Sequence, residues 1–443
     1  MFFKKKRETL LYIWLSLACK PGTTTFARLL KWKDYRGPES VYEASDEELD
    51  RLLGKSSSAS EALKNKELGQ AERILNYCEA MNIKIIAYGQ KDYPSSFAAI
   101  RRPPVLLYCK GELPCTPCMK VGVIGARAMT AYGKKHAFTI ASALASAGVW
   151  IVSGMARGID AVASAGALYA KGNTVVFLGC GIDHVYPPEH RLLSQAIEHA
   201  GAVVSEYPPG YAGDKYCFPV RNRLISAFSD CVFVVEGDSS SGSLITADAA
   251  VTQGKPIFAL PGSVDSVTSE APRILLKRGA HVADCADDIL SALSEEYPAE
   301  LMTKVLAHKE PSLSMIDSVL DAYGIMKEPP LLHRDLDETT TITRASYKTR
   351  KRPQEWRTES KESKESKESD SFKSESTEGE PPIKLAEPMH SVYLSMPKDK
   401  EVGFDTLCEL LPSVDSKSLT TALSRLCVLG LVDSLSGERY KKK

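Results

Sequence analysis

The amino-acid sequence carries no excess charge of either sign, because 56 Lys and Arg residues balance 56 Asp and Glu residues. This balance excludes a global field that would draw the protein to nucleic acid, so any such binding must come from the local placement of basic groups. Catalytic patterns are also missing from the sequence. The 8 histidines are scattered, and none stands in a serine or cysteine triad arrangement or in a paired His-Glu motif. We therefore expect no catalytic residue, no metal ion and no cofactor.

Cysteine usage excludes a disulfide scaffold. The 11 cysteines are an odd number and follow no framework spacing, which is typical of reduced thiols in a cytoplasmic protein. Cys115 and Cys118 have the spacing of a metal knuckle or a redox pair, but no second Cys or His pair accompanies them. We expect a cytoplasmic protein in which this pair holds no metal.

The sequence also lacks a long hydrophobic run that would span a bilayer. Residues 4–7 are basic and precede an apolar run at 10–19, which imitates a secretory signal. Glu8 interrupts the change from charged to apolar residues, and Lys20-Pro21-Gly22 stands where a cleavage site needs small residues. We expect a buried first helix and no contact with a membrane.

Composition and periodicity divide the chain into four regions. With 443 residues, 43% of them hydrophobic, the chain is too long for one ordinary core. Residues 1–115 are predicted to form a small helical region with a lead-in, and residues 116–295 an α/β core. Residues 296–385 contain Lys-Glu-Ser repeats, which predict a flexible charged linker with one helix near 315–326. Residues 386–443 are compact again.

Short β-branched runs alternate with Ala-rich stretches of helical length in the second region. The predicted strands lie at 121–124, 149–152, 174–178, 202–204, 231–235 and 256–260. Continuous apolar strands separated by helices indicate a Rossmann-type, doubly wound parallel sheet that is covered on both faces. Ligands of such sheets bind beyond the carboxyl ends of the strands, which is where this sequence places its glycines.

The last region has the order helix, turn, helix, β-hairpin, which predicts a winged-helix domain. Such a module binds DNA or a protein equally well. Its second helix offers only Lys417 and Arg425 as cations, whereas readers of duplex grooves usually carry more basic charge.

Glycine-lined turns follow the first two predicted strands. Gly125-Ala126-Arg127 precedes a helix that begins near Tyr132, and glycine, helix amides and a guanidinium together suit a phosphate. Ser153 and Gly154 open the second turn, which ends at Asp160. We interpret Asp160 as a helix-terminal or turn-bonding carboxylate. The G-x-G-x-x-G fingerprint of dinucleotide sites is absent from the first turn.

The segment from Lys215 to Arg223 is the most informative part of the sequence. It places Lys215, Arg221, Asn222 and Arg223 around the ring of Phe218. Cations interleaved with an aromatic ring supply charge for phosphates and a face on which a base can stack, as single-stranded nucleic acid requires. A solvated loop with Phe218 in the core remains the alternative.

A helix opens after the next strand, at Ser240 to Ala247. Gly242, Ser243 and Thr246 belong to this segment. Small hydroxyl residues around glycine can cap a helix or offer amides and hydroxyls to an anion, and these two uses are compatible.

The motifs of the core, in their order, resemble those of the DprA/Smf family. The likeness extends weakly to the N-terminal helices, which resemble a sterile-alpha-motif-like (SAM-like) domain, and to the tail. The matching motifs are 121–127, 153–160, Tyr186-Pro187, Ser205-Glu206, 218–223, 241–247 and Pro261-Gly262.

The resemblance implies an extended Rossmann fold, a homodimer formed through that core, and single-stranded DNA held in a basic pocket. It implies a recombination mediator without catalytic turnover that delivers DNA to the RecA recombinase during natural transformation. By motif match, Arg127 would hold a phosphate and Phe218 would stack on a base. The other residues implied at the site are Gly125, Ser153, Gly154, Lys215, Arg221, Asn222, Arg223, Gly242, Ser243 and Thr246.

Three positions depart from the family pattern, which usually has Gly and Asn at Ala271 and Arg273 and His at Ser164. Two further hypotheses remain open. A nucleotide-binding or nucleotide-hydrolysing Rossmann enzyme would bind at the same strand ends, although the Pro-Gly-Gly-x-Gly-Thr motif of phosphoribosyl cleavage is absent. A tethered adaptor would make its partner contacts through the tail.

Overall fold

The computed structural model describes residues 2–55, 57–114, 118–293, 308–325 and 389–396, and shorter pieces of 401–442. The chain divides into two compact units, residues 1–340 and 341–443, and each is described by itself. Within the described residues, no helix is both long enough and apolar enough to cross a membrane.

The N-terminal region is helical, as predicted. Leu11, Ile13 and Leu15 on the first helix are fully buried, because the apolar run at 10–19 forms the core of this region. The Ser45 hydroxyl accepts a hydrogen bond from the Glu48 amide, and the Glu48 carboxylate accepts one from the Ser45 amide. This capping box fixes the start of α4. The helices are α1 (Phe2–Cys19), α2 (Thr25–Leu29), α3 (Pro38–Glu43), α4 (Asp46–Leu53), α5 (Ser58–Lys64) and α6 (Gly69–Ala80).

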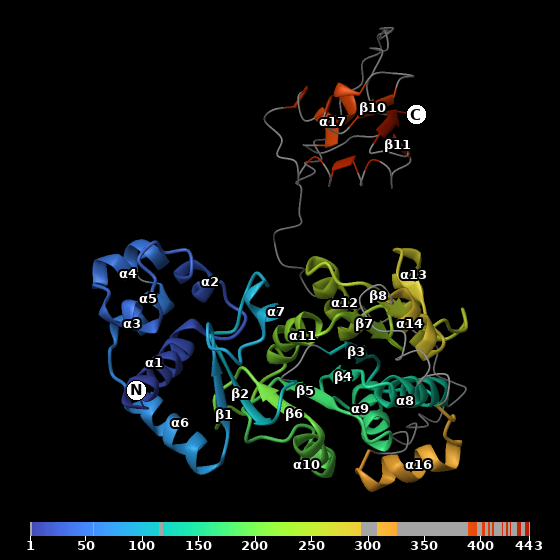
Figure 1. Ribbon diagram of the computed structural model, residues 1–443, viewed down its shortest axis with the longest axis horizontal. Helices are drawn as coiled ribbons and strands as arrows, with labels where there is room; N and C mark the ends of the chain where they lie inside the picture. Colours follow the sequence, from blue (N-terminus) through green and yellow to red (C-terminus); the bar gives the residue numbers. More distant parts are fainter. Residues whose placement is uncertain are drawn as a thin grey trace, which may run out of the picture. The chain divides into compact units, whose positions relative to one another are not determined.

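A nine-stranded sheet forms the centre of the first unit, in the order β1-β2-β6-β5-β4-β3-β7-β8-β9 (Figure 1). The seven strands from β3 to β9 run parallel to their neighbours, whereas β1 pairs antiparallel with β2 and β2 antiparallel with β6. The strands are β1 (Lys84–Ala87), β2 (Leu106–Gly111), β3 (Lys120–Ile124), β4 (Trp150–Ser153), β5 (Thr174–Leu178), β6 (Ala202–Ser205), β7 (Cys231–Val234), β8 (Ile257–Ala259) and β9 (His281–Val282).

All six predicted core strands are present, and the mostly parallel α/β sheet is confirmed. The sheet begins earlier than the predicted boundary at 116, because β1 and β2 join it from the lead-in. Pairing of Tyr108 with Ser205 connects this lead-in directly to β6. The core of the protein therefore starts near residue 84.

Helices cover both faces of the sheet (Figure 1). Phe138 of α8, Val162 of α9 and Ile197 of α10 belong to one apolar cluster, and Phe97 of α7 and Phe228 of α11 belong to the other. The helices are α7 (Ser95–Ala98), α8 (Ala131–Ser146), α9 (Ile159–Tyr169), α10 (Arg191–Ala200), α11 (Cys217–Phe228), α12 (Gly242–Thr252), α13 (Glu270–Lys277) and α14 (Ala286–Ala292).

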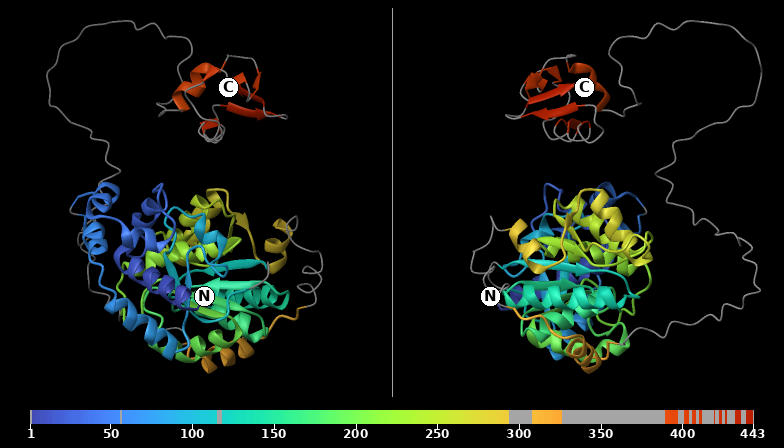
Figure 2. Two further views of the ribbon diagram at one scale, coloured as in Figure 1. Left: turned by 60° about the vertical axis from the view of Figure 1, so that its left-hand side comes forward. Right: turned by 90° about the vertical axis from the view of Figure 1, so that its right-hand side faces the viewer.

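Residues 308–325 fall in the predicted linker but pack against the core. Their helix α16 (Leu313–Ala322) buries Ile316 and Leu320 completely or nearly so, and Asp317 forms an ion pair with Lys134 of α8 at 2.9 Å. Figure 2 shows α16 in orange along the lower side of this unit. Apolar residues four positions apart put one stripe on the helix, so this segment has a face to bury. The rest of the predicted linker, 296–307 and 326–385, lies outside the described residues.

The second unit contains a small sheet of its own. Strands β10 (Glu401–Gly403), β12 (Arg439–Lys442) and β11 (Val432–Leu435) pair antiparallel in that order, and helix α17 (Met389–Ser395) contributes Val392 to the buried cluster. The predicted second helix, with Lys417 and Arg425, lies largely outside the described residues, and the winged helix stays a prediction.

Candidate nucleic-acid interface

The candidate site lies where the strand order reverses. After β3, the chain adds β4, β5 and β6 on one side and β7, β8 and β9 on the other. Such a switch point leaves a crevice beyond the carboxyl ends of the central strands. The turn Gly125-Ala126-Arg127 after β3 and Glu236 after β7 both lie there.

The expected phosphate position at the start of α8 is occupied by a carboxylate of the protein. Glu236 is 3% exposed, and it accepts hydrogen bonds from the Thr130 amide at 2.9 Å, the Thr130 hydroxyl at 2.5 Å and the Thr268 hydroxyl at 3.2 Å. A Cβ atom on Gly133 would collide with this carboxylate. A nucleotide phosphate at this helix N-terminus would have to displace a buried, hydrogen-bonded anion.

Asp160 has the structural role that the sequence indicates. It is buried near the start of α9 and accepts a hydrogen bond from the Gly154 amide at 3.2 Å. Burial raises the pKa of its carboxyl, while the nearby Arg221 guanidinium opposes that shift. The carboxylate therefore fixes the second turn of the site from inside.

Arg221 is buried rather than presented to solvent. One of its terminal nitrogens donates to the Gly154 carbonyl at 2.7 Å and to the Phe177 carbonyl, and its Nε donates to Asn222 at 3.1 Å. The ends of β4 and β5 are thereby joined through one guanidinium. Gly154 is required here because a Cβ atom would overlap this group.

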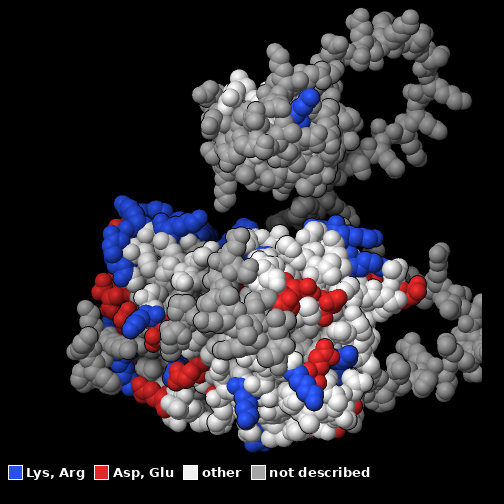
Figure 3. All heavy atoms as spheres, turned by 45° about the vertical axis from the view of Figure 1, so that its right-hand side comes forward, with Lys and Arg blue, Asp and Glu red and all other residues white. Residues whose placement is uncertain are grey.

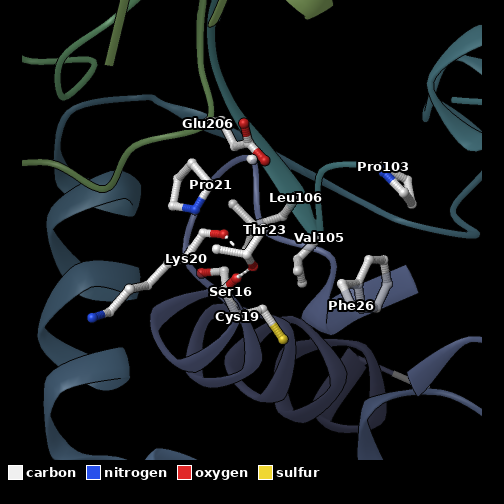
Figure 4. A pocket seen from close by; sticks show the side chains of 11 residues that line it. Ser16, Cys19, Lys20, Pro21, Thr23, Phe26, Pro103, Val105, Leu106 and Glu206 are labelled. Carbon is white, nitrogen blue, oxygen red and sulfur yellow. Dashed lines mark hydrogen bonds between the residues drawn. The ribbon is translucent and has the colours of Figure 1, made fainter. Parts of the chain in front are cut away.

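Arg223 is held in a partly buried ion pair. One of its nitrogens donates to both carboxylate oxygens of Glu206 at 2.7 Å, and its Nε and Nη1 have no partner among the described residues. Glu206 also lies against the turn Lys20 to Thr23 of the N-terminal region (Figure 4). Arg223 and Glu206 therefore lie where the helical region meets the core.

An aromatic recess lies on the outer side of the Arg221 and Arg223 side chains. The Arg127 guanidinium lies over the Phe218 ring at 5.6 Å from its centroid, and the Tyr186 ring lies 5.3 Å from the Phe218 ring. Arg127 and Tyr186 are exposed and Phe218 is half-buried. We call this recess the ring pocket; its lining residues are Arg127, Gly154, Ala156, Arg157, Tyr186, Pro187 and Phe218.

A second cation and ring, Lys215 and Tyr216, lie in the turn just before the first residue of α11. Lys215 is exposed, and its ammonium lies 5.2 Å above the Tyr216 ring. Tyr216 itself is 69% exposed, which leaves its ring available for stacking.

The segment around Gly242 mainly caps α12. The Ser241 hydroxyl accepts from the Ser243 amide, while Ser243 and Thr246 are buried. Asn222 reaches the Gly242 carbonyl at 3.4 Å. Gly242 is exposed with open space where a side chain would lie.

Similarity to known proteins agrees with this geometry. Residues 84–294 match the family model described as DNA recombination-mediator protein A. The DNA processing protein DprA of Bacillus subtilis is 37% identical over 224 residues, which are 50% of this chain and 75% of that protein. Protein Smf of Escherichia coli is 39% identical over 223 residues, or 50% of this chain and 60% of that protein.

A solved structure of a DprA protein also matches this chain. The X-ray structure of DprA from Streptococcus pneumoniae has a TM-score of 0.56 and 30% identity, and the match covers 64% of this chain and 97% of that one. The chain belongs to the DprA/Smf family. Members of this DprA family are DNA-processing recombination mediators and not known enzymes.

Each of the three positions that depart from the usual DprA pattern fits its surroundings in the structure. Ala271 is fully buried and its amide donates to the Gly237 carbonyl, and Arg273 donates to the Val264 carbonyl at 2.9 Å. Ser164, where DprA proteins usually have His, is buried and bonds back to the Asp160 carbonyl.

The structure brings together some of the expected DprA site residues and separates others. Arg127 and Phe218 meet at the surface, and Lys215 precedes α11, three positions before Phe218 in the sequence. Ser153 is buried with its hydroxyl on the Val123 carbonyl, and Gly125 packs against Ile159. Ser153 and Gly125 therefore shape the strand ends.

Sequence reasoning missed Tyr186 and Arg157 as members of the site. Arg157 is exposed and forms an ion pair with Glu189. The only signal for Tyr186 was its place in the Tyr186-Pro187 motif, because residues 186 and 218 are too far apart in the sequence for periodicity to connect them.

Charge is placed locally, as the balanced composition requires. On the face drawn in Figure 3, groups of Lys and Arg lie at the upper left and upper right, while over the lower part further basic residues lie among Asp and Glu. A neutral protein can therefore still present a basic surface.

Proposed function

We propose that the ring pocket binds single-stranded DNA, with the Phe218 ring stacking on a base and the Arg127 guanidinium contacting the adjoining phosphate. The contact of Arg127 with Phe218 is the observation that carries this proposal, because it joins a cation and a base-stacking face in one exposed recess. Lys215 beside the exposed Tyr216 ring supplies a second pair of the same kind. Membership in a family of DNA-processing mediators supports nucleic acid as the ligand.

Arg221 and Arg223 serve this function as supports rather than as phosphate contacts. Arg221 joins the Gly154 and Phe177 carbonyls beneath the pocket, and Arg223 is paired with Glu206. Asn222, Gly242, Ser243 and Thr246 form the neighbouring wall through hydrogen bonds around the start of α12.

A nucleotide-hydrolysing enzyme is the weaker alternative. Glu236 occupies the helix N-terminus where such a fold would hold a phosphate. Formation of product from nucleoside monophosphates by the purified protein would reverse this preference.

Substitutions in the ring pocket test the proposal. Phe218→Leu removes the stacking face and is expected to cost about 1 to 3 kcal/mol of binding free energy, whereas Phe218→Trp keeps that face and should retain affinity. Arg127→Glu is expected to weaken binding by at least about tenfold and to lower the salt slope of log K by about 0.7 for each lost phosphate contact. Fluorescence anisotropy with oligothymidylate over a salt series measures both effects.

Arg51→Glu is the matched control, because Arg51 is an exposed cation on α4 outside the pocket. It should leave affinity and salt slope unchanged. Wild-type affinity and salt slope in both Arg127→Glu and Phe218→Leu would refute the pocket assignment.

Because the chain belongs to the DprA/Smf family, we extend the proposal to a homodimer that delivers its bound strand to RecA. Analytical ultracentrifugation tests the dimer. The rate of RecA filament formation on coated single strands, with wild-type protein against Arg127→Glu, tests delivery. A normal rate with a variant that no longer binds DNA would contradict it.

A further inference from the structure

A second, larger groove lies on the other side of α11 from the ring pocket. It has a volume of about 810 Å³ and is bounded by the end of the N-terminal turn at Gly22, by residues near α7, and by α11 and α12. We call it the basic groove; its lining residues are Gly22, Ser96, Ala99, Ile100, Arg101, Arg102, Pro219, Val220, Arg223, Ala227, Ala249, Thr252, Gln253 and Lys255.

All charged residues that line the basic groove are cations. They are Arg101, Arg102, Arg223 and Lys255, and no carboxylate is among the described lining residues. Arg101 and Lys255 form no ion pair within the described part of the chain. Like charges around a hollow repel one another, so this arrangement favours an anionic occupant.

Two side chains at the groove have buried polar atoms without a partner, although Arg223 also pairs with Glu206. The Nε and Nη1 atoms of Arg223 have no acceptor and the Oε1 atom of Gln253 has no donor among the described residues. An unsatisfied buried polar atom is costly. These atoms are shielded from solvent, so they belong to the wall of the groove and do not contact a ligand.

The spacing of residues on α11 connects the groove to the proposed DNA site. Tyr216, Pro219, Arg223 and Ala227 recur at helical intervals, so they share one face of the helix. Tyr216 stands exposed at the start of this face with Lys215 above its ring, and the other three line the groove. Phe218 and Arg221 belong to the neighbouring face, toward the ring pocket and the strand ends.

We propose that single-stranded DNA leaving the ring pocket crosses the start of α11 over Lys215 and Tyr216 and continues into the basic groove. There Arg101, Arg102 and Lys255 contact phosphates, and the apolar floor around Ile100, Pro219 and Val220 receives bases. This inference rests on the proposed function. It adds a second segment of the binding path, built partly by the lead-in to the core.

An unpaired strand fits the groove better than a duplex does. The lining combines cations with exposed apolar surface, and only an unpaired strand offers both phosphates and free base faces. A duplex hides its bases and would leave the apolar floor without a partner.

A length series of oligothymidylates on the full chain tests the inference. Short oligomers fill the ring pocket only, whereas longer ones also reach the groove. The double variant Arg101→Glu/Lys255→Glu is expected to bind the shortest oligomers normally and to lose at least about tenfold in affinity for long ones. Its salt slope for long oligomers should fall by about 1.4, at about 0.7 for each lost contact to a single strand.

Arg51→Glu is the control for the charge change, and Arg101→Gln/Lys255→Gln is the milder version if charge reversal harms folding. Wild-type affinity and salt slope of the Gln double variant at every length would overturn the inference. The inference would also be overturned if the Gln double variant lost binding to duplex DNA but bound single strands with wild-type affinity.

The two proposals fail in distinguishable ways. If only the groove assignment is wrong, Arg127→Glu lowers the affinity for oligomers of every length, while the groove variants leave all affinities unchanged. If only the ring-pocket assignment is wrong, the groove variants lower the affinity for long oligomers, while Arg127→Glu and Phe218→Leu bind with wild-type affinity.

Discussion

The cations of one short segment have different environments, and this decides what each can do. Lys215 is exposed, Arg221 is buried against the ends of two strands, and Arg223 is held by Glu206. Neighbours on a helix point in different directions, so a count of positive charges along the chain does not give the number of phosphate contacts.

Replacing Arg221 is expected to destabilise the fold more than to change recognition of DNA. Arg221→Met leaves the Gly154 and Phe177 carbonyls without their donor and removes a nearby cation from the buried Asp160, and each buried acceptor left unsatisfied costs about 1 to 3 kcal/mol. Urea unfolding measures this loss. Arg127→Met removes an exposed guanidinium and should change the free energy of unfolding by less than about 0.5 kcal/mol. Equal stability of the two variants would show that Arg221 is not a structural cation.

His190 makes the stability of the ring-pocket region depend on pH. It is 1% exposed and lies against the Met155 carbonyl at 3.0 Å, and burial lowers its pKa from the usual value of 6.5, with Glu189 opposing and Arg157 adding to the shift. Because the folded pKa is the lower one, this contribution to stability is complete above the unfolded pKa and is lost as pH falls through the folded pKa.

The measurement is the free energy of unfolding between about pH 8 and pH 5, a range that spans the usual histidine pKa. In His190→Gln the decline toward acid should be shallower than in the wild type. His136 and His308 also have lowered pKa values, and they remain in both proteins, so the difference between the two curves isolates His190. Parallel curves would contradict the prediction.

At the scale of elements, Glu236 is expected to stabilise the start of α8. Glu236→Ala leaves the Thr130 amide and hydroxyl without their acceptor, which is expected to lower the free energy of unfolding by about 1 to 3 kcal/mol. Thermal and urea unfolding against Glu72→Ala, an exposed carboxylate on α6, measure this effect. Affinity for single strands should change little, since Glu236 does not line the ring pocket.

The central strands could be predicted because each is a continuous apolar run that is buried on both faces. Strand β9 is two residues long and exposed, so it leaves no such pattern. Strand β2 is apolar, but its place between β1 and β6 depends on pairing with residues about a hundred positions later. Local pattern does not contain that information.

The candidate site was predictable to a similar degree. The strand-end turns and Phe218 could be predicted from residue type alone. Glycine at a sheet edge and an aromatic ring among cations have few other uses there. The contact of Glu236 with Thr130 joins residues 106 positions apart, and the Arg223 pair depends on where β6 ends. These contacts arise from the topology of the sheet.

At the scale of the whole molecule, a chain with balanced charge is expected to bind DNA through the first unit. That unit contains the ring pocket and the basic groove, so removal of the residues after 340 should leave affinity for single strands unchanged. Loss of partner recruitment with full DNA binding would support the adaptor role for the tail. A large drop in affinity would instead place part of the DNA contact in the second unit.

The point of truncation matters because α16 belongs to the core. Ile316 and Leu320 are buried, and Lys134 pairs with Asp317. Burying two aliphatic side chains is worth about 3 to 6 kcal/mol. A chain that ends at 300 should therefore unfold at lower urea concentration than one that ends at 340, while its DNA affinity stays the same under native conditions.

The pair Ile316→Ala and Leu313→Ala, the latter at an exposed position of the same helix, separates packing from chain length: only the former should reproduce part of the loss. Equal midpoints for the two truncated chains would mean that the core needs no cover from residues 308–325.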